Sequence, residues 1–169
     1  LEALDQALGV DPLPFGAWFL QGQAEIDLAR FGDAITALDR ALEIEPDQAG
    51  AWYSKGLALE ELGRFAEAVK ALDRALEIEP EHARAWYTRG LALREEGKEA
   101  DAEASLSRVL SLAAKDPETT GIKGLALSAL GRPGEAVEML DRSLEGNPGD
   151  ASGWYTRGLC LVELGRFRE

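Results

Sequence analysis

The side chains that could carry chemistry are few in this chain of 169 residues. His82 is its only histidine and Cys160 its only cysteine. A catalytic triad built on histidine, or a metal site with the usual His and Cys ligands, needs several such groups at one place. A single cysteine also forms no internal disulfide. The sequence therefore predicts neither a metal site nor a disulfide framework, and we interpret Cys160 as a structural residue.

Carboxylates are numerous, yet they form no recognisable catalytic pair. Pairs such as Glu60-Glu61 and Glu95-Glu96 fall at positions expected on exposed helix faces, and no neighbouring group suggests an acid and a base acting together. The 18 glycines are mostly repeat glycines at expected helix ends or helix contacts, and they form no phosphate-binding loop. We therefore expect no enzyme activity and no cofactor.

The charge balance limits the classes of partner. The chain has 31 acidic residues against 18 basic ones, a formal net charge of −13. A negative field repels nucleic acid backbones and anionic membranes, so we expect no nucleic acid partner and a protein partner that is basic or amphipathic. The alternative is that the acidic residues only solvate helix faces. Because no apolar run reaches the roughly 18 residues of a membrane span and no signal-like start is visible, we also expect no membrane insertion and a cytoplasmic location.

Equivalent residues recur along the whole chain at a constant interval, which is the number of residues from Trp18 to Trp52. Tryptophan recurs at this step or twice this step, and glycine recurs at it without a gap. The tryptophans are Trp18, Trp52, Trp86 and Trp154, and the glycines are Gly22, Gly56, Gly90, Gly124 and Gly158. A fixed recurrence of roughly 20 to 50 residues indicates one supersecondary unit copied along the chain and stacked on its neighbours. Any function must therefore be read from the surface of the stack.

Each unit has the pattern of two helices joined by a tight turn. In the second unit, the segments 51–62 and 66–79 carry apolar residues at steps of three and four, the spacing of one helical face. Gly63 can supply the left-handed residue after the first helix, and Pro80 stops the second. The sequence therefore predicts an all-α fold of antiparallel helix pairs.

This pattern resembles the tetratricopeptide repeat (TPR), a 34-residue unit with Trp, Gly, small Ala and Pro at fixed positions. In the second unit these positions fall on Trp52, Gly56, Ala68, Ala75 and Pro80. The resemblance implies a right-handed α-solenoid superhelix, formed by a single array over residues 1–169. Its expected parts are the second helix of a partial repeat at 1–14, full repeats at 15–48, 49–82, 83–116 and 117–150, and the first helix of a partial repeat at 151–169.

Arrays of this family hold a peptide or helix of a partner on the concave face lined by the first helix of each repeat. The resemblance therefore implies a protein–protein interaction scaffold or adaptor, with its binding residues on that face. An alternative stays open, in which the same residues only fill seams between neighbouring helices. The candidate residues are Phe19, Gln23, Tyr53, Ser54, Leu57, Arg84, Tyr87, Thr88, Leu91, Arg94, Gly121 and Tyr155.

The third and fourth units depart most from the pattern. Thr120-Gly121 replaces Trp-Tyr, which predicts a recess between Tyr87 and Tyr155 that receives a partner side chain, with simple repeat decay as the rival explanation. Ala114 replaces the terminal proline of the third unit, so its second helix is expected to run on toward Lys115.

The ends of the chain keep apolar residues that are typical of internal repeats, such as Leu4 and Leu159. Terminal repeats normally carry a polar outer face, so we interpret the chain as a piece of a longer array or larger protein. We also expect end-to-end contacts between chains. They define a second function class, a structural spacer or a self-associating array that stacks through its uncapped ends.

Overall fold

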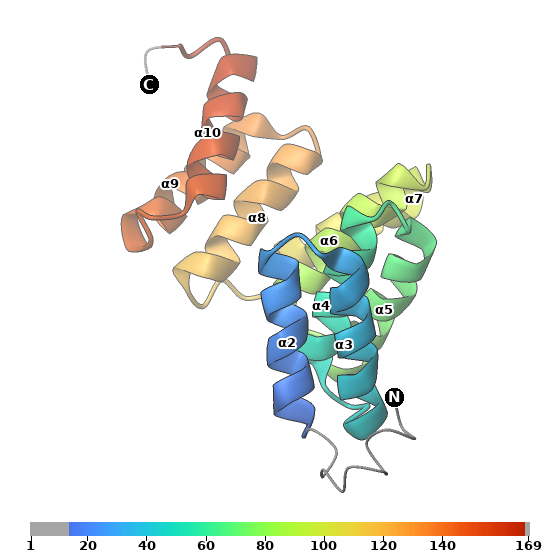
Figure 1. Ribbon diagram of the computed structural model, residues 1–169. Helices are drawn as coiled ribbons and strands as arrows, with labels where there is room; N and C mark the ends of the chain where they lie inside the picture. The colour runs from blue at the N-terminus through green and yellow to red at the C-terminus, as the bar shows by residue number, and fades with distance from the viewer. Residues whose placement is uncertain (1–13, 168–169) are drawn as a thin grey trace, which may run out of the picture. The chain divides into compact units, whose positions relative to one another are not determined.

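The computed structural model describes residues 14–167, and its regular structure in that part is entirely α-helical (Figure 1). Consecutive helices pack as antiparallel pairs, which confirms the predicted all-α solenoid of helical repeats. The second helix expected at 1–14 falls outside the described residues except for Pro14, which precedes the first described helix. The pairs are α2 (Phe15–Asp27) with α3 (Phe31–Ile44), α4 (Ala49–Glu61) with α5 (Phe65–Ile78), α6 (Ala83–Glu95) with α7 (Glu99–Ser111), and α8 (Pro117–Ala129) with α9 (Pro133–Gly146), followed by α10 (Ala151–Glu163).

The chain divides into two compact units. The first ends at Glu79 and contains α2 to α5, and the second begins at Pro80 and contains α6 to α10. In both units the turn after a first helix depends on a left-handed residue. Gly63 has a φ of 69° and Gly97 a φ of 75°, a region that glycine enters without steric cost. The left-handed turn predicted at Gly63 is therefore confirmed.

A leucine seated on a glycine holds each helix pair together. Gly56 of α4 faces Leu72 of α5, and a Cβ added at Gly56 would lie 2.7 Å from the Leu72 Cγ. The corresponding distances are 2.7 Å for Gly22 and Leu38, 2.8 Å for Gly90 and Leu106, and 2.6 Å for Gly124 and Leu140. These four leucines are at most 2% exposed. The recurring glycines therefore allow the close helix approach that buries the core leucines.

Tryptophan ties a first helix to the loop that precedes it. Trp52 Nε1 donates to the Pro46 carbonyl oxygen at 2.7 Å, and Trp86 and Trp154 donate in the same way to Pro80 and Pro148, each at 2.9 Å. The paired Trp and Pro of the repeat therefore act through a hydrogen bond between the indole N–H and the loop carbonyl.

The basic residues three places after these tryptophans are also part of the fold. Lys55 lies over the Trp52 ring, with its Nζ 5.2 Å from the ring centroid, and the same Nζ is 2.5 Å from Asp39 Oδ1 of α3. Arg157 repeats the arrangement over Trp154, and its Nε is 2.5 Å from Asp141 Oδ1. In α4 and α10 the long side chain thus joins the first helix to the preceding second helix.

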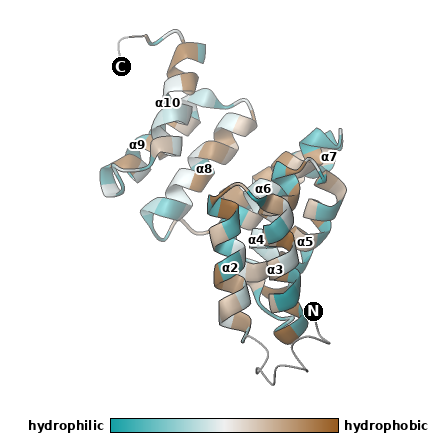
Figure 2. Ribbon diagram, viewed as in Figure 1, coloured by the Kyte–Doolittle hydropathy of each residue, from teal (hydrophilic) through white to brown (hydrophobic). Residues whose placement is uncertain are grey.

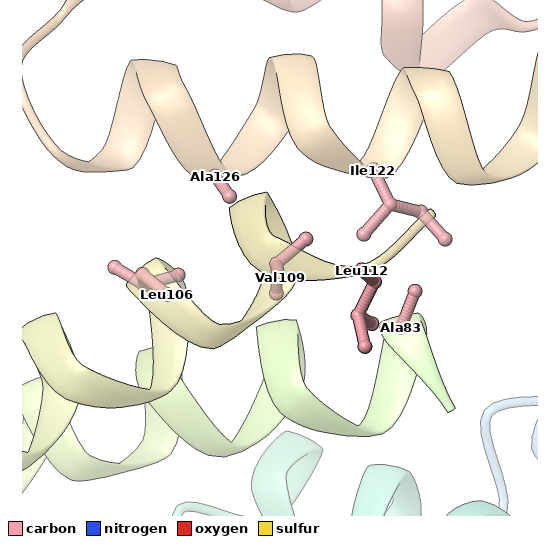
Figure 3. Packing of buried hydrophobic residues seen from close by; sticks show 6 residues of the cluster. All are labelled: Ala83, Leu106, Val109, Leu112, Ile122 and Ala126. Atoms are coloured by element: carbon pink, nitrogen blue, oxygen red, sulfur yellow. The ribbon is translucent and has the colours of Figure 1, made fainter. Parts of the chain in front are cut away.

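The junction between α7 and α8 is built differently. The expectation that the second helix of the third repeat runs on toward Lys115 is wrong. The helix α7 ends at Ser111, and Leu112 has an extended backbone with ψ 153°. This backbone turns the Leu112 side chain into a cluster with Ala83 and Ile122, where it is 6% exposed (Figure 3). Ile44, at the same repeat position, is 46% exposed. Leu112 therefore supplies apolar packing at the junction where Thr120 stands in place of tryptophan.

The helix that follows has a strong N-terminal cap. Asp116 Oδ1 accepts a hydrogen bond from the backbone N–H of Thr119 at 2.6 Å, and Pro117 occupies the first helical position. That backbone hydrogen bond lowers the pKa of the Asp116 carboxyl below its ordinary value, because it favours the charged form. The cap sets the start of α8 even though Ala114 replaces the repeat proline.

Candidate partner-binding surface

Some of the candidate residues are buried in seams between first helices. Ser54 is 3% exposed, accepts a hydrogen bond from Gln23 Nε2 of α2 at 3.1 Å, and donates to the Gly50 carbonyl oxygen at 2.8 Å. Thr88 is 5% exposed at the same repeat position of α6. For Ser54 the structure supports the seam-filling alternative, because its side chain contacts α2 and does not reach the surface, and Thr88 is likewise buried.

Gly121 also belongs to a packed contact. A Cβ at Gly121 would lie 2.7 Å from Ser143 Oγ of α9, and that hydroxyl donates to the Pro117 carbonyl oxygen at 2.6 Å. Gly121 itself is buried. The recess predicted at Gly121 is therefore wrong, because α9 closes over this face of α8 while Leu112 packs at the nearby junction.

In the first unit, the other candidates are half-buried along α2 and α4. The rings of Phe15 and Phe19 stack with their centroids 5.6 Å apart, and Phe19 also packs near Gly50 of α4. Tyr53 and Leu57, one helical turn apart on α4, keep part of their side chains at the surface. This face of the first unit therefore offers a ring and a leucine that are partly open to a partner.

In the second unit, the two candidate arginines connect α6 with α8. Arg84 Nε lies 2.6 Å from Glu118 Oε1, and Arg94 Nη1 donates to the Ala129 carbonyl oxygen at 3.3 Å, at the C-terminal end of α8. Both arginines remain exposed. They therefore have roles inside the unit and present charge to solvent at the same time.

The aromatic candidates of the second unit differ in burial. Tyr87 packs against the cluster that contains Leu112 and is half-buried, as is Leu91 one turn later. Tyr155 on α10 is 69% exposed. Tyrosine combines an apolar ring with a hydroxyl group and is enriched at interfaces for that reason. The candidate residues of α6 and α10 belong to what we call the first-helix face of this unit. This face thus carries aromatic and basic side chains.

A pocket that the repeat positions of the first helices do not indicate lies beside Arg94. It has a volume of about 280 Å³ and lies where α6, α7 and α8 meet, lined by Arg94, Glu99, Ala102, Glu103, Leu106, Ala129 and Leu130. Glu99 stands where Phe31 and Phe65 begin the second helices of earlier repeats. The change from phenylalanine to Glu99 is the signal in the sequence that could have indicated this pocket. The pocket is slightly smaller than the roughly 300–1,000 Å³ of small-molecule sites.

Other candidate chemistry finds no support among the described side chains. Cys160 is 1% exposed, and its Sγ lies 3.4 Å from Ser128 Oγ, in keeping with a structural role. Within residues 14–167, no group of three or more His, Cys, Asp or Glu side chains is placed to hold a metal ion. None of the helices in the same range has the length and apolar character needed to cross a bilayer.

Comparison with solved structures finds the same fold in other proteins. TTC0263, described as a thermophilic TPR protein of Thermus thermophilus, is 22% identical with a TM-score of 0.72, over 94% of this chain and 87% of that one. A MamA structure from Desulfovibrio magneticus RS-1 is 21% identical with a TM-score of 0.59, over 91% and 87%. YrrB, described as a TPR protein with an unusual peptide-binding site, is 22% identical with a TM-score of 0.55, over 89% and 78%.

No curated protein matches the chain at a significant level. A sequence profile of the family described as Tetratricopeptide repeat matches it at residues 1–49, 21–79, 53–117 and 123–169. These matches extend over most of the chain, and they agree with the helix pairs, the seated leucines and the Trp–Pro hydrogen bonds described above. The chain therefore belongs to the tetratricopeptide repeat family.

Proposed function

We propose that the first-helix face of each unit binds an extended or helical segment of a partner protein. Tetratricopeptide repeat proteins are in general non-enzymatic scaffolds for interactions between proteins. The observation that supports binding on this particular face is its partial exposure. Tyr53, Leu57, Tyr87 and Leu91 remain half-buried at the surface, whereas the second-helix leucines that lie on the repeat glycines are almost completely buried.

The charge of the chain supports a partner segment that is basic or amphipathic. The net charge of −13 favours approach of a positively charged segment. Rings and leucines on the same face offer apolar area to the uncharged side of an amphipathic helix. Arg84 and Arg94 of α6 already contact α8, so acidic groups on the partner are not required to balance them.

The proposal is tested by comparing two variants of the chain as bait in a lysate, with quantitative mass spectrometry of the bound proteins. One variant carries Tyr53→Ser and Tyr87→Ser on the first-helix face. The control carries Glu77→Ser and Glu138→Ser, exposed positions of α5 and α9. We expect the tyrosine variant to lose at least about 90% of a specific partner, a loss of roughly 1.4 kcal/mol or more in binding free energy.

Circular dichroism must show that both variants keep their helix content. A partner that the control variant loses to the same extent would place binding elsewhere on the chain. Equal recovery from the unchanged chain and from the tyrosine variant would contradict the proposal.

A further inference from the structure

The third repeat replaces apolar residues of its second helix by Glu99 and Glu103. The other full repeats carry apolar side chains at both positions. These are Phe31, Phe65 and Pro133 at the first position, and Ile35, Val69 and Val137 at the second. Because Glu99 and Glu103 are four places apart at the beginning of α7, both lie on the same side of that helix. The third repeat therefore carries a pair of acids where the other repeats carry apolar residues.

The apolar side chains at these two positions are packed in the other repeats. Ile35 is 8% exposed and Val137 is 3% exposed, and the ring of Phe65 is half-buried. Glu99 and Glu103 are instead exposed, and both line the pocket of about 280 Å³ described above. Figure 2 shows the turn between α6 and α7, which leads into this part of α7, in the hydrophilic colour. The two glutamates therefore border open space at positions where other repeats place packed apolar side chains.

The lining of this pocket has a buried apolar part and an exposed charged part. Ala102 and Leu106 of α7 are each 2% exposed, and Leu130, which follows α8, is half-buried. The exposed charged residues of the lining are Arg94, Glu99 and Glu103. A ligand in this pocket would therefore meet apolar surface on its inner side and charge at the opening.

The chain itself does not neutralise the two carboxylates of the pocket. In the part of the chain that the structure describes, neither the Glu99 nor the Glu103 carboxylate has a hydrogen bond or an ion pair. Lys98, directly before α7, pairs with Glu96 instead, at 3.1 Å between Nζ and Oε2. Arg94 donates to a backbone carbonyl at the end of α8. Like charges four places apart destabilise a helix, so a cation from outside would relieve an unfavourable contact.

An arginine side chain combines the features that this lining requires. Its aliphatic part can lie along apolar surface such as that of Leu106 and Leu130. Its planar guanidinium group has five N–H donors in a fixed fork and can reach two carboxylates at once, whereas a lysine ammonium is a compact, strongly hydrated charge. The volume of the pocket lies below the usual range for whole small molecules and suits one long side chain. These features favour an arginine within a protein segment over a lysine or a free small molecule.

We propose that the pocket between α6, α7 and α8 receives one arginine side chain of a partner protein. The guanidinium group lies between Glu99 and Glu103, and the aliphatic part of the side chain contacts Leu106 and Leu130. This inference goes beyond partner binding by the first-helix face, because both carboxylates belong to a second helix. It also assigns a specific contact to the basic segment that the net charge of −13 favours.

An NMR titration of the isotope-labelled chain tests the proposal. The probe is a pentapeptide with blocked ends and one arginine between glycines, and the control peptides carry citrulline or lysine in its place. Citrulline keeps the shape of arginine without its charge. We expect the arginine peptide to bind with a Kd of about 1 mM and to shift the amide signals of Ala102, Leu106 and Leu130. The citrulline peptide should bind at least about tenfold more weakly, and the lysine peptide at least about threefold more weakly.

Two charge variants separate the pocket from the overall field of the chain. Glu99→Gln combined with Glu103→Gln keeps the shape of both side chains and removes their charge. The control combines Asp101→Asn with Glu138→Gln, which removes the same charge from exposed positions outside the pocket lining. We expect the first variant to bind the arginine peptide at least about tenfold more weakly, and the control to bind it within about twofold of the unchanged chain. Circular dichroism checks that both variants keep their helix content.

The absence of saturable binding by the arginine peptide would overturn the proposal, as would equally tight binding of the citrulline or lysine peptide. Binding that the glutamine variant retains, or an equal loss in the control variant, would show that the two carboxylates do not hold the guanidinium group. Amide shifts that leave Ala102 and Leu106 unchanged would place the arginine outside the pocket. Free arginine that binds more tightly than the peptide would overturn the assignment to a partner protein.

Discussion

Replacing Leu72 by alanine is expected to lower the free energy of unfolding by about 2–5 kcal/mol, the range for removing a fully buried leucine. Leu72 is 0% exposed and lies on Gly56, which has no side chain that could move into the space. The cavity would therefore lie between α4 and α5, at the centre of a helix pair. Urea unfolding followed by circular dichroism measures the change.

The seated-leucine arrangement makes a sharper prediction for the double variant. Gly56→Ala alone should destabilise the chain, because its Cβ would lie 2.7 Å from the Leu72 Cγ and overpacking costs about 1–3 kcal/mol. In the Leu72→Ala background the same substitution meets an empty space and gains about 1 kcal/mol of helix propensity. Gly56→Ala should therefore change sign between the two backgrounds. Additive effects would contradict the direct contact between these residues.

Replacing Trp52 by alanine is the second large effect, with an expected loss of about 3 kcal/mol in the free energy of unfolding, at the lower end of the range for buried aromatic residues because Trp52 is half-buried. The variant loses packing against Leu38, Leu42 and Ala51, the hydrogen bond to the Pro46 carbonyl and the contact with Lys55. Thermal and urea unfolding should both show the loss. Trp52→Phe, which keeps a ring without the N–H group, should cost less.

Thr120→Ala is the matched control for the tryptophan, because Thr120 occupies the same repeat position at the junction of α7 and α8. Its hydroxyl donates to the Asp116 carbonyl oxygen at 2.8 Å, and the surrounding core is filled by Leu112 and Ile122. We expect a loss of about 1 kcal/mol or less. A cost equal to that of Trp52→Ala would show that the junction does not rely on Leu112 in the way described.

The repeat period predicted much of the fold because it records packing that every unit repeats. The glycine at the helix contact, the left-handed turn at Gly63 and the helix pairs follow from residues that recur once in each repeat. The role of the basic residues could also have been found. The interval from Asp39 to Lys55 is the same as that from Asp141 to Arg157, while Ser107 breaks the series before Lys123.

The irregular junction could not be predicted from the period. Apolar residues occur at the position of Leu112 in other repeats as well, so nothing in the pattern distinguished an exposed Ile44 from a buried Leu112. The difference comes from backbone geometry after Ser111, which turns the side chain inward. The replacement of Trp and Tyr by Thr120-Gly121 therefore indicated a recess. In the structure, Leu112 after α7 and Ser143 of α9 pack at these positions.

The burial of the candidate residues could not be predicted from repeat position, for a related reason. One stripe of a first helix carries both seam residues and surface residues, so repeat position alone does not separate them. Ser54 lies in the seam between α2 and α4 and Thr88 is buried, whereas Tyr155 is largely exposed. Arg84 and Arg94 were candidate binding residues, and their contacts with Glu118 and Ala129 depend on how α8 is placed beside α6.

Photo-crosslinking from the first-helix face tests the proposed function most directly. A benzophenone amino acid is placed at Tyr87, where it replaces one ring by another, and in a second chain at Arg142, an exposed position of α9. After irradiation in a lysate, we expect a discrete partner adduct from position 87 that is absent from position 142. Adducts from position 142 alone, or the same adducts from both positions, would contradict binding on the first-helix face.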